Sequence, residues 1–257
     1  MLKDRVVLVT GAGRGIGRAI ALAFAAEGSR VAVAARTREQ LENVVNEIER
    51  AGGKTLLIAD DLSDRAAPGR IVGRVLDTWG PVDVLVNNAG IGSSHQPGPL
   101  IQFDDDYWEL TLATNVTAPY LLTKLALPDM IEAGWGRIIN ISSINAKVAA
   151  MHAVAYVTSK HALAGLTKAT ALEVADKGVT CNAICPGATV TQMNDRRLEY
   201  DSQRLDTPVE QLEAKASPLG RRITPEEIAP LAVFLASDGA SAINGQLINV
   251  CGGRVMY

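Results

Sequence analysis

Short apolar runs alternate along the chain with longer segments in which apolar residues recur at helical spacing. The apolar runs are continuous rather than alternating, which is typical of strands covered on both faces of a sheet. The pattern predicts strands at residues 5–10, 30–35, 54–59, 82–86, 136–141, 179–184 and 246–250. It predicts helices at residues 15–27, 38–51, 66–79, 104–132, 155–176 and 225–237.

This alternation of strands and helices indicates an α/β fold, in which successive right-handed crossovers build a parallel seven-stranded sheet flanked by helices. Because no linker or repeat interrupts the 257 residues, we expect one domain spanning residues 1–257. Residues 189–217 depart from the rhythm, being polar and without a strand. Such a segment is typical of a lid over a binding cleft, and equally of a plain pair of surface helices.

Composition narrows the class of protein. A net charge of -3 and the lack of a basic run disfavour a nucleic-acid partner. Cys181, Cys185 and Cys251 lack metal-ligand spacing, so we expect no metal site and buried thiols in a reducing compartment. The first residues show no signal-peptide pattern and no apolar stretch is long enough for a membrane span, which favours a soluble cytoplasmic protein.

A glycine-rich turn, TGAGRGIG at residues 10–17, follows the first predicted strand and opens the first predicted helix. Glycines at such a turn let the backbone approach a pyrophosphate, which rests on the amides of the helix N-terminus. A glycine turn alone is a weak signal, but the strand before it and the helix after it predict dinucleotide binding.

The residues at the end of the second predicted strand indicate which dinucleotide the chain binds. A carboxylate there would bind the 2′-hydroxyl of the adenosine ribose, but this chain has Ala35, Arg36 and Arg38. Together with Arg14 in the glycine turn, these guanidinium groups suit a 2′-phosphate, so we expect NADP(H), with NAD(H) as the alternative. Asp61, after the third strand, suits the adenine edge or simply caps the following turn.

Tyr156 and Lys160 stand four residues apart in a helical segment, so their side chains share one helix face. A free tyrosine has a pKa of about 10, and a nearby ammonium and a cationic nicotinamide both lower it. Ser143 lies just beyond a buried strand, where a hydroxyl can hold a substrate oxygen. Asn115 is a poor helix former inside the predicted helix 104–132, and a solvent-facing position would account for it as well.

These residues resemble the motifs of the short-chain dehydrogenase/reductase superfamily, and the resemblance spans nearly the whole chain. Residues 10–17 match its glycine turn, residues 87–90 its NNAG motif and residues 186–187 its PG motif. The resemblance implies a doubly wound, single-domain Rossmann fold. The implied cofactor-binding residues are Thr10, Gly11, Arg14, Gly15, Ile16, Gly17, Arg36, Asp61, Leu62, Asn88, Ala89, Gly90, Tyr156, Lys160, Pro186, Gly187, Thr189 and Thr191.

The same resemblance assigns catalysis to Asn115, Ser143, Tyr156 and Lys160. Hydride would pass between the nicotinamide and the substrate carbon while Tyr156 handles the proton of the oxygen. Lys160 is implied to bind the nicotinamide ribose, and Asn115 to hold a water that links Lys160 to solvent. We expect the substrate to contact Ser143, Asn145, His152 and Tyr156, where Asn145 and His152 are chosen for their closeness to the catalytic residues in sequence.

The C-terminal half resembles 3-oxoacyl and polyketide ketoreductases, and shares features with 3-hydroxybutyrate dehydrogenases. We therefore expect an NADP(H)-dependent enzyme that interconverts a ketone and a secondary alcohol, acting on a small carbonyl substrate that is free or thioester-linked. An NAD-dependent secondary alcohol dehydrogenase is the alternative. A dinucleotide sensor without activity is disfavoured because the tyrosine and lysine are both present. The resemblance also implies a homodimer or homotetramer.

Overall fold

The computed structural model describes residues 2–257 and contains one seven-stranded sheet in the order β3-β2-β1-β4-β5-β6-β7. Every neighbouring pair of strands is parallel. The strands are β1 (Val6–Thr10), β2 (Arg30–Ala35), β3 (Lys54–Ala59), β4 (Val84–Asn87), β5 (Gly136–Ile141), β6 (Val179–Pro186) and β7 (Leu247–Val250). The predicted doubly wound parallel sheet is confirmed, and the strand order reverses between β1 and β4.

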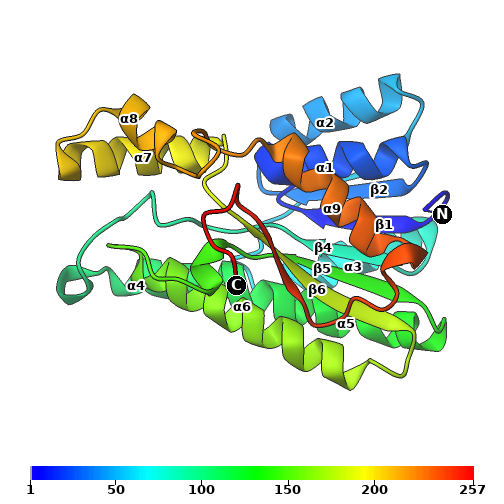
Figure 1. The fold of residues 1–257 in the computed structure, drawn as a ribbon. Coiled ribbons are helices and arrows are strands. Elements are labelled where there is room, and N and C mark those ends of the chain that lie inside the picture. Colours follow the sequence, from blue (N-terminus) through cyan, green and yellow to red (C-terminus); the bar gives the residue numbers. More distant parts are fainter. Residues whose placement is uncertain (1) are drawn as a thin grey trace.

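Helices cover both faces of this sheet (Figure 1). The α-helices are α1 (Gly15–Ala26), α2 (Arg38–Arg50), α3 (Ala67–Trp79), α4 (Asp105–Leu112), α5 (Ala118–Glu132), α6 (Val154–Glu173), α7 (Gln192–Leu205), α8 (Val209–Ala214) and α9 (Pro225–Ala236). Short turns of helix are η1 (Leu100–Gln102), η2 (Ala113–Thr117), η3 (Ile144–Ala146) and η4 (Asp238–Ala240). Figure 1 shows α1, α2 and α9 on one face and α3, α5 and α6 on the other.

Each face has its own apolar core. Phe24 of α1 and Leu41 of α2 pack with alternate residues of the central strands on one face. Ile71 of α3 and Leu122 of α5 pack with the intervening strand residues on the other. Because successive strand residues point to opposite faces, the continuous apolar runs of the sequence supply both cores at once.

One predicted helix is not continuous in the structure. The predicted helix 104–132 is divided into α4, a π-helical turn η2 and α5. The π turn contains Asn115, which is only 1% exposed, so the solvent-facing interpretation of this residue is also wrong. A π turn inserts one extra residue into the helical ladder, and such insertions occur often at functional sites.

The segment 189–217 folds into α7 and α8, which stand beyond the carboxyl ends of the strands (Figure 1). It is thus a helix pair, and it also lines a cleft there. Cys181, Cys185 and Cys251 are buried free thiols, as expected. Within residues 2–257, no helix combines the length and apolarity that crossing a membrane requires.

Candidate active site

Two adjoining clefts open at the carboxyl edge of the sheet, in which the strand order reverses between β1 and β4. The first has a volume of about 410 Å³ and is lined by the glycine turn, the ends of β2 and β3 and the segment after β4. The second, of about 740 Å³, lies between η3, α7, α8 and the C-terminal segment. Tyr156 lines both clefts, as do Ser142, Ile16, Thr191 and Met193. Open α/β sheets bind ligands at this switch point.

The glycine turn makes the floor of the first cleft. Gly11 has a φ of +63°, and a Cβ placed on it would lie 2.8 Å from the Cα of Ala89. A Cβ on Gly17 would collide with the carbonyl oxygen of Gly11. Thr10 and Asn88 hold the turn, because Asn88 Nδ2 donates to the Thr10 carbonyl at 2.8 Å and Thr10 Oγ1 accepts from the Asn88 amide at 3.0 Å.

The first cleft has the shape and the free backbone amides that a dinucleotide needs. No side chain caps the N-terminus of α1, where Arg14 is the N-cap residue, so the first amides of the helix stay available to an anion. The cleft runs from this turn to the phenol of Tyr156 and the ammonium of Lys160. A pyrophosphate would lie on the amides of Gly15, Ile16 and Gly17, with the nicotinamide end towards Tyr156.

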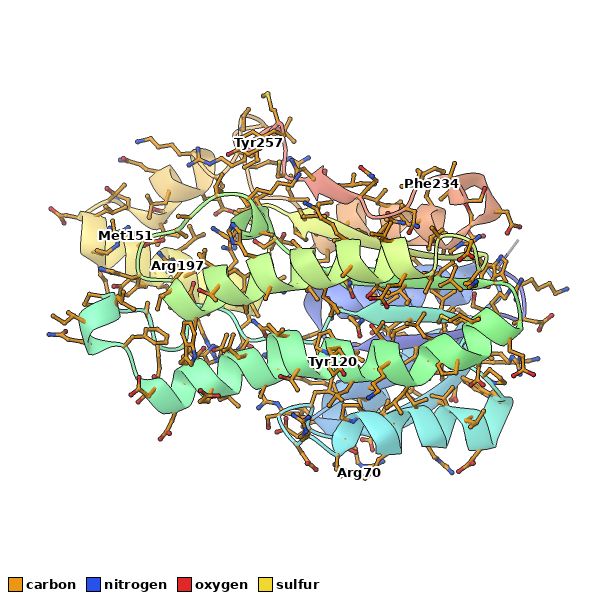
Figure 2. The ribbon with its side chains drawn as sticks, turned by 90° about the horizontal axis from the view of Figure 1, so that it is seen from below. Arg70, Tyr120, Met151, Arg197, Phe234 and Tyr257 are labelled. Carbon is orange, nitrogen blue, oxygen red and sulfur yellow. The ribbon has the colours of Figure 1, made fainter. Side chains whose placement is uncertain are left out.

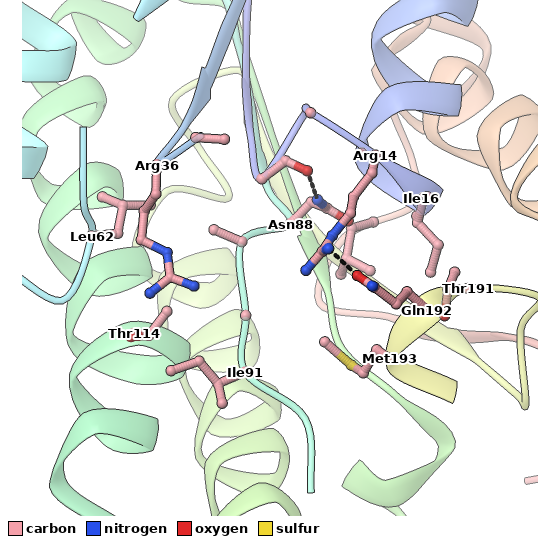
Figure 3. A pocket seen from close by; sticks show the side chains of 18 of the residues that line it. Arg14, Ile16, Arg36, Leu62, Asn88, Ile91, Thr114, Thr191, Gln192 and Met193 are labelled. Carbon is pink, nitrogen blue, oxygen red and sulfur yellow. Dashed lines mark hydrogen bonds between the residues drawn. The ribbon is translucent and has the colours of Figure 1, made fainter. Parts of the chain in front are cut away.

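Two arginines face the ribose end of this cleft from opposite sides (Figure 3). Arg36 lies 3.7 Å from Asp61 Oδ2, and both side chains are largely exposed. Arg14 donates to Gln192 Oε1 at the start of α7. The pKa of His95 is lowered by its burial and by the charges of Arg196, Arg14 and Arg36, which reflects a positive potential at this mouth.

Asp61 has a position that suits both roles considered for it from the sequence. It lines the first cleft beside Leu62, and its Oδ1 accepts from the Ser63 amide at 2.9 Å, which stabilises the following turn. The neighbouring Asp60 also lines the cleft, but its carboxylate is bound by Arg70 at 2.7 and 2.8 Å.

Most of the predicted cofactor residues line the first cleft. They are Gly11, Arg14, Gly15, Ile16, Gly17, Arg36, Asp61, Leu62, Asn88, Ala89, Gly90, Tyr156, Lys160 and Thr191. Pro186, Gly187 and Thr189 line the second cleft instead, as Tyr156 also does. Thr10 lines neither; it is 1% exposed and supports the turn from beneath.

The catalytic side chains meet where the two clefts join. Tyr156 and Lys160 lie one turn apart on α6, with Lys160 Nζ 5.6 Å from the centre of the Tyr156 ring. Lys160 Nζ donates to the carbonyl oxygen of Ile141, at the end of β5, at 2.9 Å. Ser143 follows β5, and its hydroxyl lies near enough to Tyr156 to lower the pKa of the phenol and accepts from the Asn145 amide at 3.1 Å. A substrate oxygen placed at Ser143 would thus meet the phenol.

Burial dominates the acid–base properties of this pair. Desolvation raises the pKa of Tyr156, whereas its hydrogen bond with Ser143 lowers it. Desolvation also lowers the pKa of Lys160 to about 8. Without a bound nicotinamide, the phenol therefore stays protonated at neutral pH, and the expected lowering of its pKa is absent. A proton donor is thus the resting state of Tyr156.

Asn115 connects the segment after β4 to the start of α6. Its Oδ1 accepts from the Ile91 amide at 2.7 Å, and its Nδ2 donates to the Ile91 carbonyl at 2.9 Å and to Ser159 Oγ at 3.0 Å. Ser159 Oγ in turn donates to the carbonyl oxygen of Tyr156 at 2.8 Å. The side chain thus fixes the turn of α6 that carries Tyr156, and the water relay implied by the resemblance stays a prediction.

The predicted substrate residues separate in space. Asn145 lines the second cleft, and its Oδ1 accepts from Ser143 Oγ at 3.3 Å. His152 is not among the lining residues; its Nδ1 lies 2.6 Å from Tyr200 Oη, so it links the loop before α6 to α7. The φ of His152 is +55°, in the left-handed region that a non-glycine residue rarely adopts.

The sequence interpretation missed several lining residues, which come from segments distant in the chain. In the first cleft they include Gly13, Thr37, Gln40, Ile91, Thr114, Gln192 and Met193, and in the second Ser93, Met151 and Val255. Gly13 belonged to the glycine turn that was identified. The others had no local signal, because only the fold brings them to the sheet edge.

Known proteins share this architecture over the whole chain. The family model for short chain dehydrogenase matches residues 5–201. The D-beta-hydroxybutyrate dehydrogenase of Cupriavidus necator is 38% identical, with 99% of each chain aligned. A Streptomyces coelicolor protein provisionally assigned as a ketoacyl reductase is also 38% identical, over 99% of this chain and 98% of that one.

A solved structure agrees with these sequence matches. It is a variant of the actinorhodin polyketide ketoreductase with NADPH, which superposes with a TM-score of 0.94 at 38% identity, covering 99% of this chain and 98% of that one. The chain therefore belongs to the short-chain dehydrogenase/reductase family and is an oxidoreductase that acts on CH–OH groups.

Proposed function

We propose that this enzyme reduces a ketone to a secondary alcohol with NADPH, and that Tyr156 donates the proton. The observation that carries the proposal is the meeting of Ser143, Tyr156 and Lys160 at the junction of the two clefts. This junction gives the phenol access to a cofactor on one side and to a substrate on the other.

The chain's own residues prepare both ends of the reaction. When bound, the nicotinamide supplies the hydride. Ser143 and Tyr156 hold the carbonyl oxygen, and the phenol O–H donates its proton as the alkoxide forms. Lys160, held by the Ile141 carbonyl, stabilises the phenolate that remains. Asn115 positions α6 through Ser159, so the phenol stays aligned.

The preference for NADP(H) rests on charge. Arg14 and Arg36 line the ribose end of the cleft, and Ala35 stands where a carboxylate would repel a 2′-phosphate. Asp61 already pairs loosely with Arg36, so a phosphate would replace a weak, exposed ion pair. The NADPH in the similar ketoreductase structure supports the same preference.

We assign the second cleft to the substrate and 189–217 to its lid. A volume of about 740 Å³ accommodates more than a three- or four-carbon ketone, and the similarity to a ketoacyl reductase and a polyketide ketoreductase supports a 3-oxoacyl or polyketide-like substrate.

A second candidate is a dehydrogenase that oxidises a secondary alcohol with NAD. The equal identity to D-beta-hydroxybutyrate dehydrogenase favours it. Arg14 and Arg36 at the first cleft argue instead for NADP(H), because their guanidinium groups suit a 2′-phosphate. A sensor without activity would have no use for the Ser143–Tyr156–Lys160 arrangement.

The test begins with binding of NADPH and NADH to the purified protein, monitored by nucleotide fluorescence. Turnover is then measured with the better cofactor on 3-oxoacyl thioesters, cyclic ketones and secondary alcohols. Tight NADPH binding with ketone reduction supports the proposal. NADH preference with alcohol oxidation would replace it by the second candidate.

A further inference from the structure

Basic side chains line part of the second cleft. Four basic side chains line the cleft, Arg197, Arg204, Lys215 and Arg254, and Asp201 is the one acidic residue among its described lining residues. The catalytic end, in contrast, presents the neutral hydroxyls of Ser143 and Tyr156. The cleft therefore carries an excess of positive charge.

Two of the four cations share the single negative charge of Asp201. Arg197 Nε donates to Asp201 Oδ2 at 2.8 Å, and Arg204 Nη2 donates to Oδ1 at 3.0 Å. Arg197 also donates to Ser93 Oγ at 3.2 Å and to the Met151 carbonyl at 2.7 Å, and it is only 15% exposed. These contacts commit Arg197 to the walls of the cleft. Figure 2 shows Arg197 close to Met151.

Lys215 and Arg254 are different, because neither side chain has a hydrogen bond or ion pair with any of residues 2–257. Both are exposed towards solvent as well as lining the cleft. Unpaired cations on a surface are ordinary. Lys215 and Arg254, however, share one cleft with apolar side chains and with the catalytic hydroxyls, so a ligand bound there can contact them.

The fold brings these two cations to the same end of the cleft. Lys215 directly follows α8, and Ser217, two residues on, packs against the turn that carries Arg254: a Cβ on Gly252 would lie 2.7 Å from Ser217 Oγ. The next glycine, Gly253, is close to Pro218, since a Cβ there would lie 3.4 Å from its Cγ.

The turn that carries Arg254 is itself fixed. Val255 is buried, and its backbone amide donates to Cys251 Sγ at 3.4 Å. Lys147, next to η3, donates to the Tyr257 carbonyl oxygen at 2.5 Å and to the Leu247 carbonyl oxygen at 3.0 Å. Arg254 therefore projects from an anchored segment, which lowers the entropic cost of recruiting it to a ligand.

Part of the cleft lining is apolar. It includes Val148, Ala149, Ala150, Leu198, Leu212 and Val255. A ligand that spans the cleft would thus place a carbonyl at Ser143 and Tyr156, an apolar body along this wall and an anionic group at Lys215 and Arg254.

We propose that Lys215 and Arg254 form a subsite for an anionic group, a carboxylate or a phosphate, on the substrate at the end remote from its ketone. This proposal rests on the proposed ketone reduction for the position of the carbonyl. The anion subsite selects substrates by charge, and the hydroxyls of Ser143 and Tyr156 select them by the ketone.

Turnover tests the charge preference with matched substrates. Straight-chain methyl ketones that end in a carboxylate are compared with their methyl esters, over several chain lengths. At the best length we expect kcat/KM about tenfold higher for the acid. Lys215→Gln and Arg254→Gln should each lower that ratio about three- to fivefold, since partly exposed ion pairs contribute modestly. The ratio should also fall as salt rises.

Matched controls lie at the opposite edge of the sheet. Arg50→Gln, at the end of α2, and Lys54→Gln, at the start of β3, remove the same charges from outside the cleft and should leave the ratio unchanged. Equal loss in all four variants would mean a general effect of net charge and would overturn the proposal. So would an ester reduced as well as its acid at every length.

A binding measurement separates this proposal from the proposed function. Calorimetry compares octanoate and octanamide on protein saturated with NADP⁺, with no turnover involved. Octanoate should bind more tightly, and Lys215→Gln with Arg254→Gln should abolish the difference. Equal binding of the two probes overturns the anion subsite, whether or not a ketone is reduced. A failure of every ketone to react overturns the proposed function alone.

The two sources of the anion are distinguished in a second pair of substrates. A 3-oxoacyl thioester of pantetheine is compared with the thioester of 4′-phosphopantetheine. A preference for the phosphorylated arm that Arg254→Gln removes assigns the subsite to a carrier phosphate. A preference confined to the keto acids assigns it to a substrate carboxylate, and absence of both preferences overturns the subsite.

Discussion

At the scale of single residues, the properties of Tyr156 depend on three neighbours that arrive from different elements. Ser143 follows β5, Lys160 lies one turn further along α6, and Asn115 reaches α6 from the π turn. With these three neighbours in place and no cofactor bound, the phenol stays protonated. They hold it where a carbonyl oxygen and a nicotinamide can both approach, so removal of the phenol hydroxyl should affect chemistry rather than binding.

Tyr156→Phe is expected to lower kcat for ketone reduction by at least about 10²-fold, since general acid catalysis contributes about that much. NADPH affinity, measured by fluorescence titration, should change little because the glycine turn and the arginines remain. Ser143→Ala serves as a comparison that keeps the phenol, and its kcat should fall less than that of Tyr156→Phe. Substantial residual activity in Tyr156→Phe would exclude this tyrosine as the proton donor.

The raised pKa of Tyr156 gives the two directions of reaction opposite dependence on pH. Reduction consumes the phenol proton, which is present throughout the neutral range, so its rate should be flat from about pH 6 to 7, below the pKa of about 8 of Lys160. Oxidation needs the phenolate, whose fraction rises about tenfold per pH unit below the pKa. Initial rates in both directions across this range test the assignment, and an oxidation rate independent of pH would contradict it.

Arg36 is the residue on which the cofactor prediction chiefly depends. Arg36→Asp places a carboxylate at the end of β2, where it would bind a ribose 2′-hydroxyl and repel a 2′-phosphate. We expect the ratio of kcat/KM for NADPH to that for NADH to fall at least about tenfold, as for the loss of a charge-assisted hydrogen bond of about 1.4 kcal/mol or more. Arg38→Asp, whose guanidinium lies 3.9 Å from Glu42 outside the cleft, is the control.

At the scale of elements, the sequence predicted the strands well, because short, continuous apolar runs bounded by glycine are typical of strands buried on both faces. It failed at helix 104–132, because the prediction continued through the weak helix formers Thr114, Asn115 and Val116 and past Pro119, which stands in the first turn of α5. The π turn is set by tertiary contacts of Asn115 with Ile91 and Ser159, which no local pattern contains. Such an override of local propensity is expected at a functional site.

Helix α7 is tied to the rest of the substrate cleft through Arg197. Its guanidinium joins α7 to Ser93 after β4 and to Met151 before α6, so it fixes three walls at once. Arg197→Gln should raise KM for the ketone about fivefold or more with a smaller change in kcat, because the lost hydrogen bonds position the cleft and not the proton.

The same variant should leave NADPH affinity unchanged, which a general loss of structure would not. Arg197→Lys keeps the charge but not the planar fork, and it should restore KM only in part. Glu199→Gln, at an exposed position of the same helix, should leave KM and kcat unchanged. A parallel loss of NADPH binding in Arg197→Gln would show that α7 supports the whole site rather than the substrate cleft.

At the scale of the whole molecule, the candidate site could be predicted only where the chain carries a local signature. The glycine turn, the Tyr156–Lys160 spacing and Ser143 after a strand have one, and the structure brings these together. Met193, Gln40 and Arg254 have none, because their place depends on how α7, α2 and the C-terminal segment pack around the sheet edge. His152, chosen by sequence distance, is instead paired with Tyr200.

The outer face formed by α5 and α6 is the surface on which the predicted oligomer can be tested. Tyr120 and Leu125 of α5 and Leu172 of α6 are 43%, 41% and 81% exposed, and Figure 2 shows these helices side by side with Tyr120 between them and the viewer. Exposed apolar side chains on one face favour pairing with a second copy. Light scattering should therefore give a multiple of the 27.2 kDa chain mass.

Leu172→Glu places a charge on this face and should shift the population towards smaller species at micromolar concentration, because burying an unpaired carboxylate is costly. Leu76→Glu, on α3 and 46% exposed, adds the same charge elsewhere and should leave the mass unchanged. If the protein is monomeric, the α5–α6 face is simply solvated. If both variants dissociate the oligomer equally, the contact lies on another face and net charge, rather than this helix pair, controls assembly.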